Sequence, residues 1–274
     1  MPAIPENLRA PGLPRSRALI FALVAATPPL MILLWRWSVA AALALFLLAH
    51  AAILLPIFLP RLRWLGPVVT TFAPEPADAK VVWLTIDDGP DPDDTPVILD
   101  LLDRYGARAT FFLKGELAAA HPAMVQAMVE RGHQVANHSH THPTKFFWCA
   151  PPATVEGEIR RCNAAIAGAG APEPALFRAP VGIKSPALHP VLGRLGMRLC
   201  AWSIRAFDGV TGFDPAVVEA RVLGQLAPGA ILCMHQGVRD RGGAPLSAEG
   251  LGRVLAGLHA RGYRCEIPAL DRLR

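Results

Sequence analysis

Charged residues are scarce in this 274-residue sequence: they make up 18% of it, whereas hydrophobic residues make up 52%. Soluble domains usually have about a quarter of their residues charged, so this composition excludes an ordinary soluble domain and a disordered chain. Aromatic residues are also few, at 7%, and the basic residues form no cluster despite a net charge of +5. We therefore expect no nucleic-acid partner, and the positive charge fits a protein that lies against anionic membrane lipid.

The sequence also lacks any Cys-x-x-Cys pair, which argues against a cysteine zinc site or a redox motif. Its five cysteines are odd in number and widely spaced, so no disulfide framework is expected, and most are predicted to be small buried hydrophobes. No repeat of 20–50 residues is present, which excludes a solenoid. Lysine is rare among the 27 basic residues, as is typical of GC-rich bacterial genomes.

Two long uncharged runs lie near the N-terminus, at residues 18–35 and 37–59, separated only by Arg36. At a rise of about 1.5 Å per residue, a helix over either run is long enough for a hydrocarbon layer of about 30 Å. Arginines flank the pair on both sides, at positions 9, 15, 17, 61 and 63. The positive-inside rule then predicts a hairpin with both ends in the cytoplasm and Arg36 at its outer tip.

An alternative interpretation remains open because Pro28 and Pro29 interrupt the first run. The first segment is then too short to span the membrane, or is a signal peptide cleaved after Ala26, and a single span begins near Leu30. Both interpretations predict an anchored protein of the bacterial inner membrane, multi-pass in the hairpin case. They differ in the side of the membrane on which the rest of the chain lies.

The chain divides into four parts: a tail over residues 1–17, the hairpin or anchor over 18–59, a proline-containing linker over 60–79, and a soluble domain over 80–274. In the soluble domain short apolar runs alternate with helical patterns, which predicts βαβ units and a parallel sheet. The predicted strands are 81–86, 109–113, 134–137, 176–177, 198–202, 230–234 and 263–267. About seven such units favour a closed or nearly closed (β/α) barrel.

Ionisable residues follow five of these strands, and in such barrels the site lies at the carboxyl ends of the strands. They are Asp87 and Asp88, then His138, His140 and His142, then Arg178, then Asp208, and finally His235. Five strands that deliver such groups to one rim are difficult to explain by chance. The sequence therefore predicts a catalytic site there.

One carboxylate and two imidazoles with an open position form a common catalytic site for Zn²⁺. His138 and His142 are four residues apart, so one tight loop can direct both at an ion, whereas His140 is expected to point elsewhere. Asp87 and Asp88 leave the strand consecutively and their side chains diverge. One is therefore able to bind the metal while the other accepts a proton from a bound water.

The remaining ionisable residues complete this scheme. His235 is free to protonate a leaving amine or alcohol, and Arg178 is able to hold the base carboxylate. Asp208 is able to fix an imidazole in one tautomer. Backbone N–H groups around residues 180–182 are able to face a developing oxyanion. The implied reaction is metal-assisted hydrolysis of an amide or ester.

In order and spacing, these residues resemble the NodB-homology polysaccharide deacetylases, carbohydrate esterase family 4. The matching motifs are Thr85-Ile-Asp87-Asp88-Gly-Pro90, His138-Ser-x-x-His142, Arg178-x-Pro180, Asp208 and His235. The resemblance covers about residues 80–267. It implies a distorted (β/α) barrel and a metal-dependent de-N-acetylase or, less often, a de-O-acetylase. It further implies Asp87 as catalytic base, Asp88, His138 and His142 as metal ligands, Arg178 positioning Asp87, His235 as acid, and Asp208 orienting His235.

The sequence departs from the family pattern mainly in the walls of the expected acyl pocket. Val181 replaces a tyrosine, Arg205 and Gly209 replace an aspartate and a tryptophan of the fourth motif, and Cys233 replaces a leucine. We expect a pocket that is wider, or refilled by a residue such as Trp148 or Trp202. The resulting hypothesis is that the enzyme accepts a different acyl group or an unusual sugar.

The sequence as a whole predicts a membrane-anchored, metal-dependent hydrolase that removes an N-acyl group, with N-acetyl expected, from a carbohydrate. Zn²⁺ is the expected metal, and Co²⁺, Ni²⁺ or Mn²⁺ fit the same ligands. The substrate is an envelope polysaccharide or a sugar on a lipid carrier, depending on the side of the membrane. The alternative function is an inactive, membrane-tethered carbohydrate-binding protein on the same fold.

Overall fold

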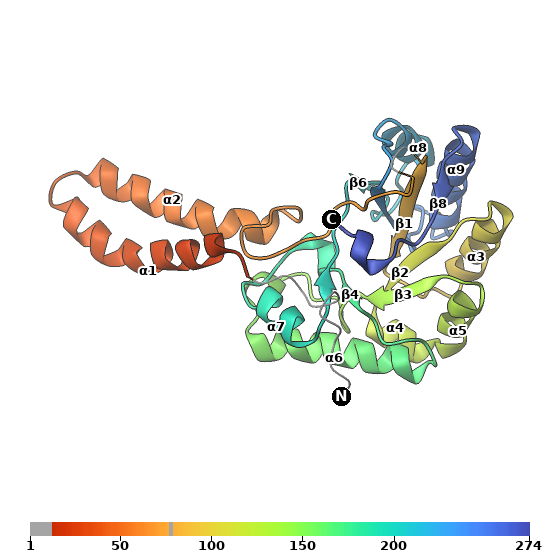
Figure 1. The fold of residues 1–274 in the computed structure, drawn as a ribbon, viewed down its shortest axis with the longest axis horizontal. Coiled ribbons are helices and arrows are strands. Elements are labelled where there is room, and N and C mark those ends of the chain that lie inside the picture. The colour runs from red at the N-terminus through yellow and green to blue at the C-terminus, as the bar shows by residue number, and fades with distance from the viewer. Residues whose placement is uncertain (1–12, 77–78) are drawn as a thin grey trace.

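The computed structural model describes residues 13–76 and 79–274 and shows a helical hairpin that projects from an α/β domain (Figure 1). The hairpin consists of α1 (Arg15–Trp35) and α2 (Val39–Phe58), which lie side by side. Both helices are long and apolar enough to cross a membrane, by length and composition alone.

Helix α1 continues through Pro28 and Pro29, the residues that the alternative interpretation takes as an interruption. Within this stretch, the Thr27 hydroxyl donates a hydrogen bond to the Leu23 carbonyl oxygen at 2.8 Å. Such local bonds help a proline to be accommodated in an apolar helix. At the turn, the Ser38 side chain caps α2 by accepting from the Ala41 N–H.

The domain is built on a curled sheet of eight parallel strands, in agreement with the predicted distorted (β/α) barrel. The strands are β1 (Val81–Asp87), β2 (Ala109–Leu113), β3 (Gln134–Asn137), β4 (Leu176–Phe177), β5 (Arg198–Leu199), β6 (Ile204–Arg205), β7 (Ala230–His235) and β8 (Arg264–Cys265). Their order is β5-β4-β3-β2-β1-β7-β6, and β8 pairs with the start of β1. The sheet is open, because β5 and β6 form its opposite edges. The strand predicted at 198–202 ends at Leu199, and β6 follows as a separate strand outside the predicted range.

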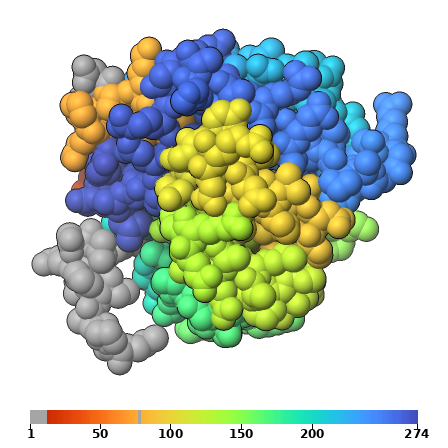
Figure 2. Space-filling model, turned by 90° about the vertical axis from the view of Figure 1, so that its right-hand side faces the viewer, coloured from red at the N-terminus to blue at the C-terminus, as the bar shows by residue number. Residues whose placement is uncertain are grey.

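Seven helices accompany the strands, and at the end remote from the hairpin α3, α5 and α9 form much of the surface (Figures 1 and 2). They are α3 (Asp94–Arg104), α4 (Gly115–Ala120), α5 (Pro122–Glu130), α6 (Pro152–Gly168), α7 (Leu188–Arg194), α8 (Pro215–Leu223) and α9 (Ser247–Ala260). Helix α8 begins at Pro215, and the carboxylate of the preceding Asp214 accepts from the Ala216 N–H at 2.8 Å.

Successive side chains of β1 point alternately to the two faces of the sheet and pack in two different hydrophobic cores. Val82, Leu84 and Ile86 belong to the core that includes residues of α3 and α9. Val81 and Trp83 belong to a second core, with residues of β4, β5 and α7. Because successive strand residues point to opposite faces, Asp87 lies on the same face as Trp83. The Asp87 carboxylate, at the end of β1, therefore points into the interior of the curled sheet.

Residues 68–72, within the predicted linker, are packed into the domain. Val69 donates its N–H to the Leu199 carbonyl and accepts from the Ala201 N–H, while the Phe72 N–H donates to Gly229. The Val68 and Phe72 side chains are buried in the second core. This segment thus connects β5, at one edge of the sheet, with the start of β7.

The base of the hairpin is held against the domain by Lys184. Its buried ammonium donates to the carbonyl oxygens of Leu59, Pro60 and Leu62, at 2.8, 3.2 and 2.7 Å. These carbonyls lie just beyond the last residue of α2, Phe58, where the chain leads from the hairpin into the domain. The interaction fixes how the hairpin and the domain are oriented relative to each other.

We expect Lys184→Met to loosen this attachment, because it removes the ammonium that joins three carbonyls to the domain. A loss of about 1.4 kcal/mol in the local opening free energy makes cleavage about tenfold faster. The measurement is trypsin cleavage of the full chain in detergent, at Arg61 and Arg63. The control is Lys145→Met, an exposed lysine. Equal cleavage rates in both variants would contradict this role for Lys184.

Candidate active site

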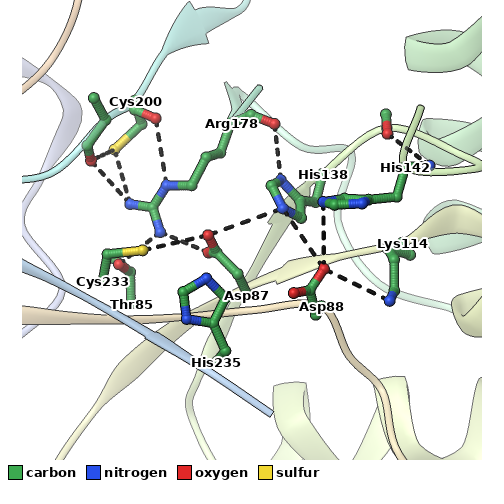
Figure 3. A network of polar contacts seen from close by, with 12 residues as sticks. Thr85, Asp87, Asp88, Lys114, His138, His142, Arg178, Cys200, Cys233 and His235 are labelled. Carbon is green, nitrogen blue, oxygen red and sulfur yellow. Dashed lines mark hydrogen bonds and ion pairs between the residues drawn. The ribbon is translucent and has the colours of Figure 1, made fainter. Parts of the chain in front are cut away.

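The carboxyl ends of four strands of the sheet, β4, β3, β1 and β7, bring predicted site residues together (Figure 3). Asp87 ends β1 and lies opposite His235, the last residue of β7, in the parallel register. His138 directly follows β3, and Arg178 directly follows β4. Parallel pairing therefore places all four groups at one rim, as the sequence predicts.

Asp87 is buried and paired with Arg178, which is itself fully buried. The guanidinium Nη1 lies 2.6 Å from Asp87 Oδ1 and 2.8 Å from Thr85 Oγ1, and Nη2 donates to the Ala201 carbonyl at 2.9 Å. The guanidinium also lies over the Phe112 ring, 4.0 Å from its centroid. Arg178 thus fixes one oxygen of Asp87 and leaves the other, Oδ2, directed toward His138 and Cys233 (Figure 3).

Asp88, His138 and His142 form a separate cluster, in which one ligand atom from each lies within 4.8 Å of the others. Asp88 Oδ1 is 3.5 Å from His142 Nε2 and 3.9 Å from His138 Nε2. His138 Nδ1 is bound to the Arg178 carbonyl at 2.9 Å, which turns Nε2 toward the cluster. Such a second hydrogen bond is typical of metal-binding histidines.

This cluster fits a divalent cation. Asp88 Oδ1 is buried and has no hydrogen-bond partner, which is costly unless a cation completes the site. Burial lowers the pKa of His142 to about 4, and the neighbouring His138 adds to this effect. His142 is therefore neutral at physiological pH, the form that binds metal. Burial alone would raise the pKa of Asp88, but His138, Lys114 and His142 together hold it below its usual value.

The loop that carries both histidines is anchored by Glu158 on α6. Its carboxylate accepts from the backbone N–H groups of His140 and Thr141, at 2.9 and 2.8 Å. The His140 ring packs against Gly115, where a Cβ atom would come within 2.4 Å of it, and takes no part in the cluster. This agrees with the prediction that His140 points elsewhere.

His235 is held by Asp208, whose side chain is buried. Asp208 Oδ1 lies 2.8 Å from His235 Nδ1, and Oδ2 accepts from the His235 backbone N–H at 3.0 Å. Burial opposes the charged imidazolium, but the hydrogen bond and charge of Asp208, with the charges of Asp87 and Asp88, raise the pKa of His235 to about 9. His235 is therefore protonated at neutral pH.

These groups open into a cavity of about 270 Å³. Its walls include Trp202 and three of the residues that depart from the family pattern, Val181, Arg205 and Gly209. A Cβ atom on Gly209 would lie about 3.1 Å from the His235 ring, so the glycine lets the chain pack on that ring. Trp202 thus occupies a wall, whereas the Trp148 ring packs against Phe58, with centroids 6.3 Å apart.

Two polar neighbours of the site were not predicted from the sequence. Cys233, expected only as an apolar wall, donates its thiol to Asp87 Oδ2 at 3.4 Å. Burial raises the pKa of this thiol well above its usual value, so it stays protonated. Lys114 lies 3.6 Å from Asp88 Oδ1. Lys114 directly follows β2, so its position at the end of a strand is the sequence signal that marks it as a neighbour of the site.

Comparisons with known proteins agree on one family. A family model described as polysaccharide deacetylase matches residues 75–200. A chitooligosaccharide deacetylase of Sinorhizobium fredii is 34% identical over 194 residues, which cover 68% of this chain and 88% of the relative. A peptidoglycan-N-acetylglucosamine deacetylase of Bacillus cereus is 30% identical over 191 residues, which cover 69% of this chain and 86% of that relative.

Solved structures agree as well. A family 4 carbohydrate esterase from Streptomyces lividans, in complex with acetate, superposes with a TM-score of 0.61 at 30% identity, and the match covers 71% of this chain and 97% of that chain. With the curled parallel sheet and the Asp-His-His cluster, these similarities show that the chain belongs to the polysaccharide deacetylase family, carbohydrate esterase family 4.

Proposed function

We propose that the protein is a metal-dependent carbohydrate deacetylase that hydrolyses the N-acyl group, with N-acetyl expected, of an amino sugar. The observation that carries the proposal is that two adjacent carboxylates have different partners: Asp87 is held by Arg178, and Asp88 faces His138 and His142. This gives a proton acceptor and a cation site side by side. The relatives' substrates, chitooligosaccharides and peptidoglycan N-acetylglucosamine, support an amino sugar.

In this proposal Asp88, His138 and His142 hold the metal, with Zn²⁺ expected. A bound divalent ion polarises the acyl oxygen and lowers the pKa of water. Co²⁺, Ni²⁺ and Mn²⁺ accept the same ligands, so the donor set by itself does not select zinc.

The other groups of the site divide the proton transfers between them. As the water oxygen adds to the acyl carbon, the Asp87 carboxylate accepts a water proton, oriented by Arg178. As the C–N bond breaks, His235 gives the proton on its Nε2 to the leaving amine, and Asp208 stabilises the imidazolium through Nδ1. The products are a carboxylate and a free amino sugar.

All seven polar groups expected from the family are present: four form the pairs Asp87–Arg178 and His235–Asp208, and the remaining three form the Asp-His-His cluster. This completeness supports activity rather than an inactive binding protein. The substitutions at Val181 and Gly209 alter the walls of the cavity, Cys233 contacts Asp87, and the set of polar groups stays complete. Tolerance of a different acyl group remains part of the proposal.

We further propose that the hairpin crosses the membrane twice, so that the domain lies on the cytoplasmic side. The support is the arginines before and in the first turn of α1 and those after α2, with Arg36 alone at the tip. The substrate is then met at the membrane surface.

Removal of the metal tests the proposed chemistry. Dialysis of the full chain against a chelator is expected to abolish acetate release from N-acetylglucosamine tetramer, and Zn²⁺ is expected to restore it. The variant Asp87→Asn is expected to keep stoichiometric metal and lose about 10²–10⁴-fold in kcat. Undiminished acetate release from the metal-free enzyme, or from Asp87→Asn, would contradict the mechanism.

The His235–Asp208 pair predicts a specific pH response. Because the acid must be protonated, activity is lost as the pH rises through the pKa of His235, about 9. Asp208→Asn removes the charge that raises this pKa, so the alkaline limb of kcat/KM moves to lower pH, by about one to two units. The control Asp100→Asn alters an exposed carboxylate that pairs with Arg131. An unshifted alkaline limb in Asp208→Asn would refute the assignment of His235 as the acid.

Fusions after Arg274 test the topology. With the proposed hairpin, a fluorescent protein is expected to fluoresce, and a phosphatase that folds only in the periplasm is expected to be inactive. Phosphatase activity would instead indicate a single effective span or a cleaved signal peptide.

A further inference from the structure

Arg205, on β6, brings an unpaired positive charge into the active-site cavity. It lines the same cavity as Asp87, Asp88 and His138. Its Nε atom is buried and has no hydrogen-bond partner. Within the described residues, 13–76 and 79–274, no carboxylate lies within ion-pair distance of its guanidinium.

The guanidinium is nevertheless held in place by aromatic rings. Its Cζ atom lies 5.4 Å from the centroid of the Trp202 ring and 4.9 Å from that of Phe207. Cation–π contacts of this kind orient a guanidinium while leaving its N–H donors unused. Arg178, the other arginine beside the cavity, uses its donors on Asp87, Thr85 and Ala201.

A guanidinium with unused donors is suited to a planar or tetrahedral anion, because its N–H groups match carboxylate and phosphate oxygens. Leaving such a charge partly buried without a partner is unfavourable, and the cost is relieved when an anionic ligand arrives. Arg205 therefore points to a substrate that carries a negative charge beside the amino sugar.

The rim of the cavity is apolar and exposed. Val181, Phe207 and Val210 border the cavity and are 43%, 53% and 62% exposed. Val181 and Phe207 have positive φ angles, of 49° and 62°. This conformation is unfavourable for such residues, most of all for a β-branched one, so the fold maintains the two side chains at the rim at a cost.

The end of α2 lies close to a wall of the cavity. Phe58, the last residue of α2, packs against Trp148, and Pro60 lies against Gly182, a residue of the cavity wall. At Gly182 a Cβ atom would come within 2.5 Å of Pro60, so the two segments approach closely. The clamp by Lys184 fixes this arrangement. One wall of the cavity thus lies beside the segment that directly follows α2.

We propose that the substrate is an N-acylated amino sugar joined through a phosphate to a membrane lipid. Arg205 binds the phosphate, and the rim formed by Val181, Phe207 and Val210 rests on the bilayer that holds the lipid. The inference rests on the proposed deacetylase function and names its substrate class. The reaction is unchanged: water is consumed, the C–N bond breaks, and the phosphate linkage stays intact.

The test compares three substrates that share N-acetylglucosamine, with the full chain in phosphatidylethanolamine–phosphatidylglycerol vesicles. They are the neutral tetramer, soluble N-acetylglucosamine 1-phosphate, and polyprenyl-phosphate-linked N-acetylglucosamine in the same vesicles. Arg205→Gln is expected to lower the kcat/KM of both phosphorylated substrates, relative to the tetramer, by about 10- to 100-fold. Most of the change is expected in KM, and Arg205→Lys is expected to restore part of it.

The matched control is Arg221→Gln. Arg221 lies over Phe207, with its Cζ 4.5 Å from the ring centroid, but it is not part of the cavity. This variant is expected to leave the substrate ratios unchanged. An equal loss on all three substrates in Arg205→Gln would assign Arg205 a structural role and overturn the proposal.

A substitution in the rim tests whether the phosphate belongs to a lipid-linked substrate or to a soluble one. Val210→Ser is expected to lower the kcat/KM of the polyprenyl substrate relative to N-acetylglucosamine 1-phosphate, by about fivefold. An unchanged ratio, or a wild-type preference for the soluble phosphate, would overturn the lipid part of the inference.

The proposed function and this inference fail in different ways. Efficient turnover of the tetramer with no preference for either phosphorylated substrate refutes the inference and leaves the deacetylase intact. If no substrate is turned over, calorimetric titration of Asp87→Asn with N-acetylglucosamine 1-phosphate still tests Arg205. The affinity for N-acetylglucosamine 1-phosphate is then expected to be weaker in the double variant Asp87→Asn/Arg205→Gln than in Asp87→Asn alone. An equal affinity in the two variants would refute the inference.

Discussion

The buried ion pair between Arg178 and Asp87 connects most of the site. Through Arg178, the segment after β4 contacts the end of β1, the Phe112 ring on β2, the carbonyl after β5, and His138 after β3. A buried ion pair of this kind contributes little net stability, but loss of one partner leaves an uncompensated charge and typically costs about 3–5 kcal/mol. The pair is therefore better understood as a constraint that sets the relative positions of five strands and of the groups they carry.

This constraint also explains how two adjacent carboxylates take different parts. Asp87 belongs to the regular strand and points into the curl, where it meets Arg178 and the Cys233 thiol. Asp88 leaves the strand at a φ of 76°, so its side chain turns toward the two histidines. Consecutive residues of the same type are thus placed in different environments, one paired with a guanidinium and the other suited to a cation. The proposed division between base and metal ligand depends on this local change of direction.

The hairpin contributes more than attachment. Its base is packed against the domain through Lys184 and Pro60, and residues 68–72 continue from it into the sheet. The direction in which the cavity opens is consequently fixed relative to the apolar helices. A flexible linker in place of this segment would allow the domain to sample many orientations. The packed segment does not, and it brings the apolar rim beside the end of α2.

The sequence by itself determined the alternation of strands and helices, the two apolar helices and the groups that gather at the carboxyl ends of the strands. These features follow from local periodicity and from the geometry of parallel sheets, so they can be read without coordinates. Only the tertiary structure decided which partner each group meets. Residues 198–205 form two edge strands rather than one, Cys233 is a donor rather than a wall, and Lys184 binds carbonyls more than 120 residues away. Arg205, a departure from the family pattern in the sequence, became an unpaired guanidinium only when its neighbours were known. Hydrogen bonds and charge pairs between distant segments depend on packing in three dimensions, and local sequence patterns do not encode that packing.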